Sequence, residues 1–306
     1  ALDDEGMRMD DLEETLKANP GAKFIYVMPN FHNPAGTTMP LERRLRLVEL
    51  AAQYGPFIVE DDPYGELRYE GNDVTPIGAL HKENVIYLST FSKTLAPSLR
   101  LGWIVAPERA MTKLIHAKQG MDLHTSNLVQ HLTYDICQRG ILRAHVRKIR
   151  KLYRERRDIM LECMERHFPP GTQWTRPQGG LFLWVRLPEG LDTQELLSIA
   201  VKEKVAFVPG HAFYPPGSED GRCCMRLNFS NATPEMIEVG IERLGRALRR
   251  QMDEAEAQAS AEVPGFGVRL KLFCGGCLRR TTDQHRPADC CGPPRAIFWL
   301  FPGGWS

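Results

Sequence analysis

The sequence predicts an α/β fold: a mainly parallel sheet with helices on both faces, followed by a smaller α+β C-terminal domain. Short apolar runs of strand length alternate with helix-period segments from the start of the chain, which is typical of a parallel sheet. A long basic amphipathic segment over residues 141–168 then separates this pattern from a shorter mixed one. With 306 residues, 42% hydrophobic and 25% charged, the chain is long enough for two packed domains.

Each element of the first domain follows from its own pattern. Between the first two apolar runs, leucines alternate with Glu42, Arg43, Arg44 and Arg46, the mixed pattern of a helix that packs on a sheet. The strands are expected at residues 24–28, 57–60, 85–88 and 101–106, with this helix over 41–52.

The second domain begins with the long helix, which bridges the two domains. Its helices are capped by Asp192 and Thr233. We expect strands at 181–187, 205–208 and 224–229, and helices at 192–202 and 234–250. The predicted domains are therefore residues 1–141 for the large domain and 142–252 for the interdomain helix and small domain.

Residues 253–306 lack any hydrophobic period and become rich in Cys, Gly and Pro, so we predict an unstructured tail. A zinc site is the alternative, built from the cysteines and histidine at Cys274, Cys277, His285, Cys290 and Cys291. The adjacent pair Cys290 and Cys291 does not form a second Cys-x-x-Cys knuckle. We therefore predict no metal.

The charge balance bears on partners. Lys plus Arg number 39 and Asp plus Glu 38, so electrostatics gives no reason to expect nucleic acid or an anionic membrane as a partner. No run of eighteen apolar residues occurs, and residues 1–5 lack the pattern of a secretion signal. We expect a cytoplasmic protein with a small-molecule ligand.

One lysine stands where a chemical role is plausible on physical grounds. Lys93 lies in Thr90-Phe91-Ser92-Lys93, just past the apolar strand at 85–88, and Arg100 follows seven residues later. An amine at such a position, beside a cation, loses its proton readily enough to form a Schiff base with an aldehyde. The hydroxyls of Thr90 and Ser92 and the guanidinium of Arg100 suit a phosphate dianion.

Taken together, the motifs resemble those of the fold-type-I, pyridoxal-phosphate-dependent aminotransferases of class I/II. The lysine segment is similar to their cofactor-lysine signature. Two further motifs stand upstream in the family's order, each after an expected strand: Asn33-Pro34-Ala35-Gly36 and Asp61-Asp62-Pro63-Tyr64. Taken singly, each motif has a plainer reading as a turn, a strand-end loop or a surface residue. Their shared order favours the family.

The resemblance implies roles for these residues around bound pyridoxal 5'-phosphate. Asp61 keeps the pyridine ring protonated, because a buried carboxylate favours its N–H⁺ form. Asn33 and Tyr64 bind the ring's 3′ oxygen, and the Asn33–Pro34 peptide is expected to be cis. Thr90, Ser92 and Arg100 bind the phosphate, and Lys93 forms the Schiff base.

Substrate binding is implied by a segment near the end of the small domain. Arg226, in Cys224-Met225-Arg226-Leu227-Asn228, resembles the family's arginine for the substrate α-carboxylate, and Asn33 assists it. The implied activity is ping-pong transfer of an amino group from an L-amino acid to a 2-oxo acid such as 2-oxoglutarate, with Lys93, Asp61 and Tyr64 as catalytic residues. The match is closest to the branch of 2-aminoadipate and broad-specificity aromatic aminotransferases.

The resemblance runs from about Leu2 to about Arg250 and lacks the family's N-terminal third, which supplies early strands and part of the phosphate site. We therefore expect an exposed sheet edge, an uncovered apolar face, and weak or no cofactor binding by this chain alone. The complete protein is expected to be a homodimer. Two alternatives stay open: the aminotransferase-like body of a winged-helix transcriptional regulator, and a lyase or synthase on the same fold.

Overall fold

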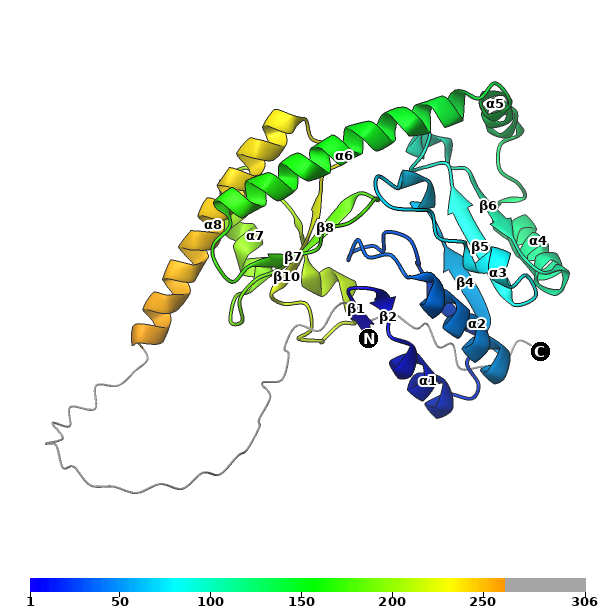
Figure 1. The fold of residues 1–306 in the computed structure, drawn as a ribbon, viewed down its shortest axis with the longest axis horizontal. Helices are drawn as coiled ribbons and strands as arrows, with labels where there is room; N and C mark the ends of the chain where they lie inside the picture. The colour runs from blue at the N-terminus through cyan, green and yellow to red at the C-terminus, as the bar shows by residue number, and fades with distance from the viewer. Residues whose placement is uncertain (262–306) are drawn as a thin grey trace, which may run out of the picture.

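Two four-stranded sheets, joined by the long helix α6 (Ile141–His167), form the main body of the chain. The computed structural model describes residues 1–261. Figure 1 shows α6 running from α5 and the first sheet at one end to α8 and the second sheet at the other. The fold class expected from the sequence is confirmed, and the division at residues 141 and 142 stays a proposal.

The first sheet has the order β3-β4-β5-β6. The strands β3, β4 and β5 pair in parallel, while β6 pairs antiparallel with β5. Their bounds are Phe24–Val27, Phe57–Asp61, Val85–Thr90 and Gly102–Val105, within two residues of the predicted ends. A mainly parallel sheet needs crossover helices, and these supply its first covered face.

That covered face packs on helices α1 (Met9–Ala18), α2 (Leu41–Tyr54) and the short α3 (Ile77–Leu80). Ile25 of β3, Ile58 of β4 and Val85 of β5 stand side by side in the register and are buried in one cluster with Leu47 and Leu50 of α2. The small hairpin of β1 (Leu2–Asp3) and β2 (Gly6–Met7) closes the N-terminal end of this cluster.

The opposite face of the sheet is partly buried, and the far edge is exposed. All four residues of β6 are exposed, with Val105 at 61%, and β6 pairs on one side only among the described strands. The first turn of helix α4 (Glu108–Asp122) contacts the sheet, because the guanidinium carbon of Arg109 lies 4.4 Å from the centroid of the Phe57 ring in β4. Helix α5 (Asn127–Gln138) then leads into α6. An exposed edge was expected from the sequence and is present at β6, while the other face of β3 to β5 is partly buried rather than uncovered.

The second sheet is antiparallel and has the order β7-β8-β10-β9. Leu183, Trp184 and Val185 of β8 are all buried in a core that also takes in residues of α6 and α8. The side chain of Asp192 caps the next helix by accepting from Gln194 N at 2.7 Å, as predicted. The elements are β7 (Gln173–Trp174), β8 (Phe182–Arg186), α7 (Thr193–Lys202), β9 (Val208–Pro209), β10 (Cys224–Asn228) and α8 (Pro234–Ala261).

The C-terminal helix corrects one prediction. From the sequence, this helix was predicted to end at residue 250 and an unstructured tail to begin at residue 253. In the structure, α8 continues to Ala261. The added segment, 253–261, is rich in Ala and Glu, which favour helix. It has no apolar period, and for this reason the sequence pattern did not predict a helix there. The expected strand at 205–208 is shorter, since β9 holds only Val208 and Pro209. The rest of the predicted tail, with the weighed zinc site, lies outside the described residues.

Three short 3₁₀ turns lie in the connections, at Gly65–Leu67, Pro97–Leu99 and Gly210–Phe213. No helix within residues 1–261 combines the length and apolar character needed to cross a bilayer.

The core of the second sheet provides a stability test. Leu244 of α8 is fully buried in this core, while Val239 on the same helix is 44% exposed. We expect Leu244→Ala to lower the free energy of unfolding by about 2–5 kcal/mol, because it leaves a cavity. Val239→Ala should change it by less than about 0.5 kcal/mol. Chemical denaturation checks both, and equal losses would contradict the packing described.

Candidate functional site

The carboxyl ends of β3, β4 and β5 meet at one edge of the first sheet, because these strands are parallel neighbours. The loop after β3 carries Asn33, the end of β4 carries Asp61 with Tyr64 beyond it, and the turn after β5 carries Lys93. Three motifs far apart in sequence therefore follow strands that end at one edge of the sheet.

Asp61 is the last residue of β4 and lies on the same face of the sheet as Tyr26 of β3. The Tyr26 hydroxyl donates to Asp61 Oδ2 at 2.5 Å. Burial raises the pKa of the Asp61 carboxyl, while the hydrogen bond from Tyr26 works in the opposite direction. The site therefore begins with a partly buried carboxylate whose orientation is fixed by a phenol.

Tyr64 follows three residues later and is 4% exposed. Its ring meets the Phe182 ring edge to face, with centroids 5.7 Å apart. Burial raises the pKa of the Tyr64 hydroxyl to about 12, with Arg226 acting in the opposite direction, so the hydroxyl keeps its proton at neutral pH. Because Phe182 belongs to β8, this contact joins the first-sheet edge to the second sheet.

Arg226 of β10 completes the junction between the sheets. One of its terminal nitrogens donates to Asn33 Oδ1 at 2.7 Å, across 193 residues of sequence. Its guanidinium carbon lies 4.2 Å from the centroid of the Phe182 ring and 5.1 Å from that of Phe213. Arg226 Nε is buried without a hydrogen-bond partner among the described residues, and burial lowers the pKa of the side chain. The Asn33–Pro34 peptide is cis, as expected.

The turn after β5 is held by its own hydroxyls. Ser92 N donates to Thr90 Oγ1 at 3.0 Å, and Thr90 Oγ1 donates to the Leu101 carbonyl at 3.0 Å. Lys93 is exposed and has no hydrogen bond or ion pair within residues 1–261. The turn thus presents a free amine at the sheet edge where Asp61 ends β4.

Arg100 is the predicted residue with the weakest local support. It adopts a left-handed backbone conformation with φ of 50°, is exposed, and its guanidinium reaches only the Pro97 carbonyl, at 3.3 Å. Asn33 and Arg226 are therefore hydrogen-bonded, and Tyr64 and Arg226 both contact the Phe182 ring. Asp61 is bonded to Tyr26 and acts on Tyr64 electrostatically, while Thr90, Ser92, Lys93 and Arg100 share the neighbouring segment after β5.

Sequence reasoning missed several residues that support this edge, and Tyr26 and Arg44 are the clearest. Arg44 is fully buried and donates to Asn30 Oδ1 at 2.7 Å and to the backbone carbonyls of Met39 and Thr75. Burial lowers the pKa of Arg44 to about 10. In the sequence, Arg44 stood among residues taken as a charged helix surface. The one sequence feature that could have indicated its burial is its position between the leucines of α2.

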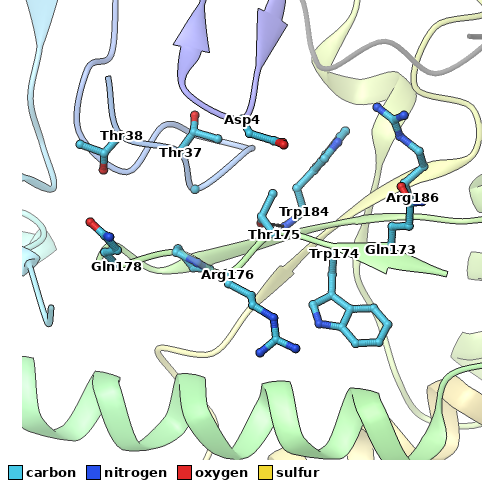
Figure 2. Close-up of a pocket in the computed structure, with 12 residues that line it drawn as sticks. Asp4, Thr37, Thr38, Gln173, Trp174, Thr175, Arg176, Gln178, Trp184 and Arg186 are labelled. Carbon is cyan, nitrogen blue, oxygen red and sulfur yellow. Dashed lines mark hydrogen bonds between the residues drawn. The ribbon is translucent and has the colours of Figure 1, made fainter. Parts of the chain in front are cut away.

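Two cavities lie near the junction but do not hold the predicted cluster. Figure 2 shows one of about 700 Å³, where Asp4, Thr37 and Thr38 face Thr175, Trp184 and Arg186 of the second-sheet region. None of the predicted residues lines it. Another, of about 550 Å³, is lined by Asp62, Tyr87 and Ser89, and of the predicted residues it includes Thr90. Chemistry and connectivity, rather than cavity size, therefore locate the candidate site.

The carboxyl edge of a parallel α/β sheet, where the segments carrying Asp61, Tyr64 and Lys93 end, is the place where such folds bind ligands. Residues 2–244 match the family described as "Aminotransferase class I and II", which covers most of the chain. The chain belongs to this family, and the resemblance recognised from its motifs is confirmed.

Relatives agree with the expected branch. The chain is 48% identical to aromatic-amino-acid aminotransferase 1 of Thermococcus litoralis, over 82% of this chain and 61% of that protein. It is 40% identical to the 2-aminoadipate transaminase of Thermus thermophilus, over 80% of this chain and 62% of that protein. The crystal structure of a multiple substrate aminotransferase from Thermococcus profundus matches with a TM-score of 0.79 and 43% identity, over 83% of this chain and 64% of that one.

The chain thus spans about three fifths of the length of these relatives. A weaker match, 32% identical over 82% of this chain, is an uncharacterized HTH-type transcriptional regulator of Bacillus subtilis, of which the chain covers 51%.

The buried Arg44 network provides a test of how the site loop is held. We expect Arg44→Met to lower the free energy of unfolding by about 3–5 kcal/mol, because it leaves buried acceptors and the nearby Glu60 and Asp62 carboxylates without their cation. Arg46→Met on the same helix is the matched control. Arg46 pairs with Glu13 and Glu49 at the surface, so its loss should cost less than about 1 kcal/mol. Urea titration measures both, and similar losses would contradict this role of Arg44.

Proposed function

We propose that the complete protein is a pyridoxal-phosphate-dependent transaminase, which transfers an amino group from an L-amino acid to a 2-oxo acid such as 2-oxoglutarate. The carrying observation is that the Asn33–Arg226 hydrogen bond lies close to Tyr64, whose hydroxyl is influenced electrostatically by both Arg226 and Asp61, and that Asp61 ends β4 beside the strand that leads into the Lys93 turn. Family membership supports the same chemistry.

The residues present fit pyridoxal phosphate. Asp61 Oδ2 accepts a hydrogen bond from Tyr26, while no donor among residues 1–261 is bonded to Oδ1. Oδ1 therefore has capacity to accept a hydrogen bond from the ring nitrogen. Since Asn33 Oδ1 accepts from Arg226, the Asn33 amide nitrogen is free to bind the ring oxygen together with the Tyr64 hydroxyl. Thr90, Ser92 and Arg100 would hold the phosphate, and Lys93 Nζ would bind the aldehyde.

Arg226 is proposed to bind the α-carboxylate of the amino acid. Its stacking on Phe182 and its bond to Asn33 hold the guanidinium plane in place, and its unpartnered Nε is a donor without another use. A guanidinium fork held in this way binds a carboxylate with two parallel hydrogen bonds.

Proton movement is assigned to Lys93. When bound, pyridoxal phosphate supplies an aldehyde that takes up the amino group and a cationic ring that withdraws electrons from the substrate Cα. Lys93 Nζ would then remove the proton at Cα and later return one, as general base and acid. Asp61 keeps the ring cationic because it remains an anion next to the ring nitrogen.

The names of the relatives support aromatic amino acids or 2-aminoadipate as amino donors, and we propose a donor from one of these classes. We also propose that the complete protein is a cytoplasmic homodimer, following the family resemblance. The HTH-type relative supports the second candidate, a regulator body that senses the cofactor, more weakly than the transaminases support the first.

The cofactor lysine can be tested on this chain even where binding is weak. The chain is incubated with a dilution series of pyridoxal phosphate, reduced with borohydride to trap lysine-bound cofactor, and digested for mass spectrometry. We expect labelling of the Lys93 peptide at the lowest concentrations, because Lys93 follows the strand that pairs with Asp61. Lys93→Ala should abolish this high-affinity label.

Lys113→Ala, which removes an exposed lysine of α4, is the matched control and should leave the Lys93 label unchanged. Labelling spread evenly over surface lysines, or low-concentration labelling that survives Lys93→Ala, would contradict the proposed function.

The carboxylate site is tested through the release of that label. An L-amino acid that binds at Arg226 should compete cofactor away from Lys93, so trapping falls as L-glutamate or L-phenylalanine is added. We expect Arg226→Lys to require about 10- to 100-fold more amino acid for the same fall, since one ammonium replaces a two-pronged contact. Arg222→Lys, which alters an exposed arginine on Asp192, should leave the curve unmoved. An equal shift in both variants would count against Arg226.

A further inference from the structure

The Tyr26 hydroxyl is hydrogen-bonded directly to Asp61, the carboxylate proposed to bind the ring nitrogen of the cofactor. The Tyr26 hydroxyl donates to Asp61 Oδ2 at 2.5 Å, within the range of a charge-assisted O–H···O bond. Both side chains are partly buried. Tyr26 belongs to none of the motifs that identify the family in this sequence.

The geometry of this pair is set by the sheet. Tyr26 pairs with Val59 in the parallel register of β3 and β4, so Tyr26 and Asp61 project from the same face. The tyrosine is thus one strand away and slightly behind the carboxylate. Its hydroxyl binds Oδ2, and no donor among residues 1–261 is bonded to Oδ1.

We propose that Tyr26 is a positioning residue for the cofactor: it holds Asp61 Oδ2 and so directs Oδ1 at the ring nitrogen. This inference rests on the proposed function and adds a residue to it. Tyr26 itself is not assigned a contact with substrate or cofactor.

The electrostatics around Asp61 agree with that assignment. Burial raises the pKa of Asp61, and the neighbouring Asp62 carboxylate raises it further, while Tyr26 is the group whose hydrogen bond lowers it. Tyr64 also faces Asp61, and its own pKa is raised by burial. Burial and the Asp61 carboxylate raise the pKa of Tyr26, which therefore stays a donor at neutral pH. Without Tyr26, Asp61 would take up a proton at higher pH and lose the charge that the ring nitrogen needs.

The chain contains a matched comparison on the next strand. Tyr87 of β5 donates to Asp62 Oδ2 at 3.0 Å, and Asp62 also accepts from Asn30 at 3.0 Å. Here a phenol binds a carboxylate within a buried network that connects to Arg44 rather than to the open edge. Tyr87→Phe therefore makes the same chemical change in the same sheet, at a carboxylate without the proposed role.

The experiment compares the full chain with its Tyr26→Phe and Tyr87→Phe variants. The titration of the Asp61 carboxyl is followed without cofactor by ¹³C NMR, with the signal assigned by its loss in Asp61→Asn. The concentration of pyridoxal phosphate that half-saturates the borohydride-trapped label on Lys93 is measured in parallel. Thermal unfolding of each variant reports whether the fold is kept.

In Tyr26→Phe we expect the Asp61 midpoint to move to higher pH and the half-saturating cofactor concentration to rise about tenfold, the loss of one charged hydrogen bond. In Tyr87→Phe the cofactor concentration should stay within about twofold of the unmodified chain. An Asp61 midpoint that does not move in Tyr26→Phe overturns the inference, as does an equal loss of labelling in both variants. Labelling that is present in the unmodified chain but survives Lys93→Ala would count against the proposed function instead. The Asp61 titration needs no cofactor, so it decides whether Tyr26 controls this carboxylate even if cofactor binding by this chain is too weak to label Lys93.

Discussion

The parallel register of β3, β4 and β5 is the constraint on which the candidate site depends. Ile25, Ile58 and Val85 are aligned across the three strands and buried against α2, which fixes the face that each following residue takes. A slip of one residue in β4 would turn Asp61 into the covered side and Asp62 toward the open edge. The apolar core therefore determines which of two adjacent carboxylates becomes available for chemistry.

These two carboxylates show how neighbouring residues of one type acquire different roles. Asp62 is 6% exposed and shares its oxygens with Asn30 and Tyr87, in a network that Arg44 neutralises. Asp61 accepts one bond from Tyr26 through Oδ2, and its Oδ1 has no donor among the described residues. A fully satisfied buried carboxylate stabilises its loop, whereas a partly satisfied one retains capacity for a ligand.

The sequence predicted the strands, the long helix and the order of the motifs, because these depend on local periodicity and on residues adjacent in the chain. It did not predict Tyr26 or Arg44, whose importance arises from pairing register and burial. In α2, the fully buried Arg44 and the surface Arg46 look alike in the sequence, and only the packed structure distinguishes them. The extent of α8 was missed for the opposite reason: its last turns follow helix propensity without an apolar period.

The second sheet contributes Arg226 to the candidate site. Arg226 lies on β10, yet its bonded partner Asn33 follows β3, so this contact depends on the packing of the two sheets against each other. Its buried Nε has no partner within the described residues, and a buried charged donor left unpaired costs free energy. Stacking on Phe182 fixes the side chain but does not satisfy that donor. An arginine held rigidly with an unused hydrogen-bonding group has little value for stability, and this favours the view that its arrangement serves a ligand carboxylate that arrives from outside.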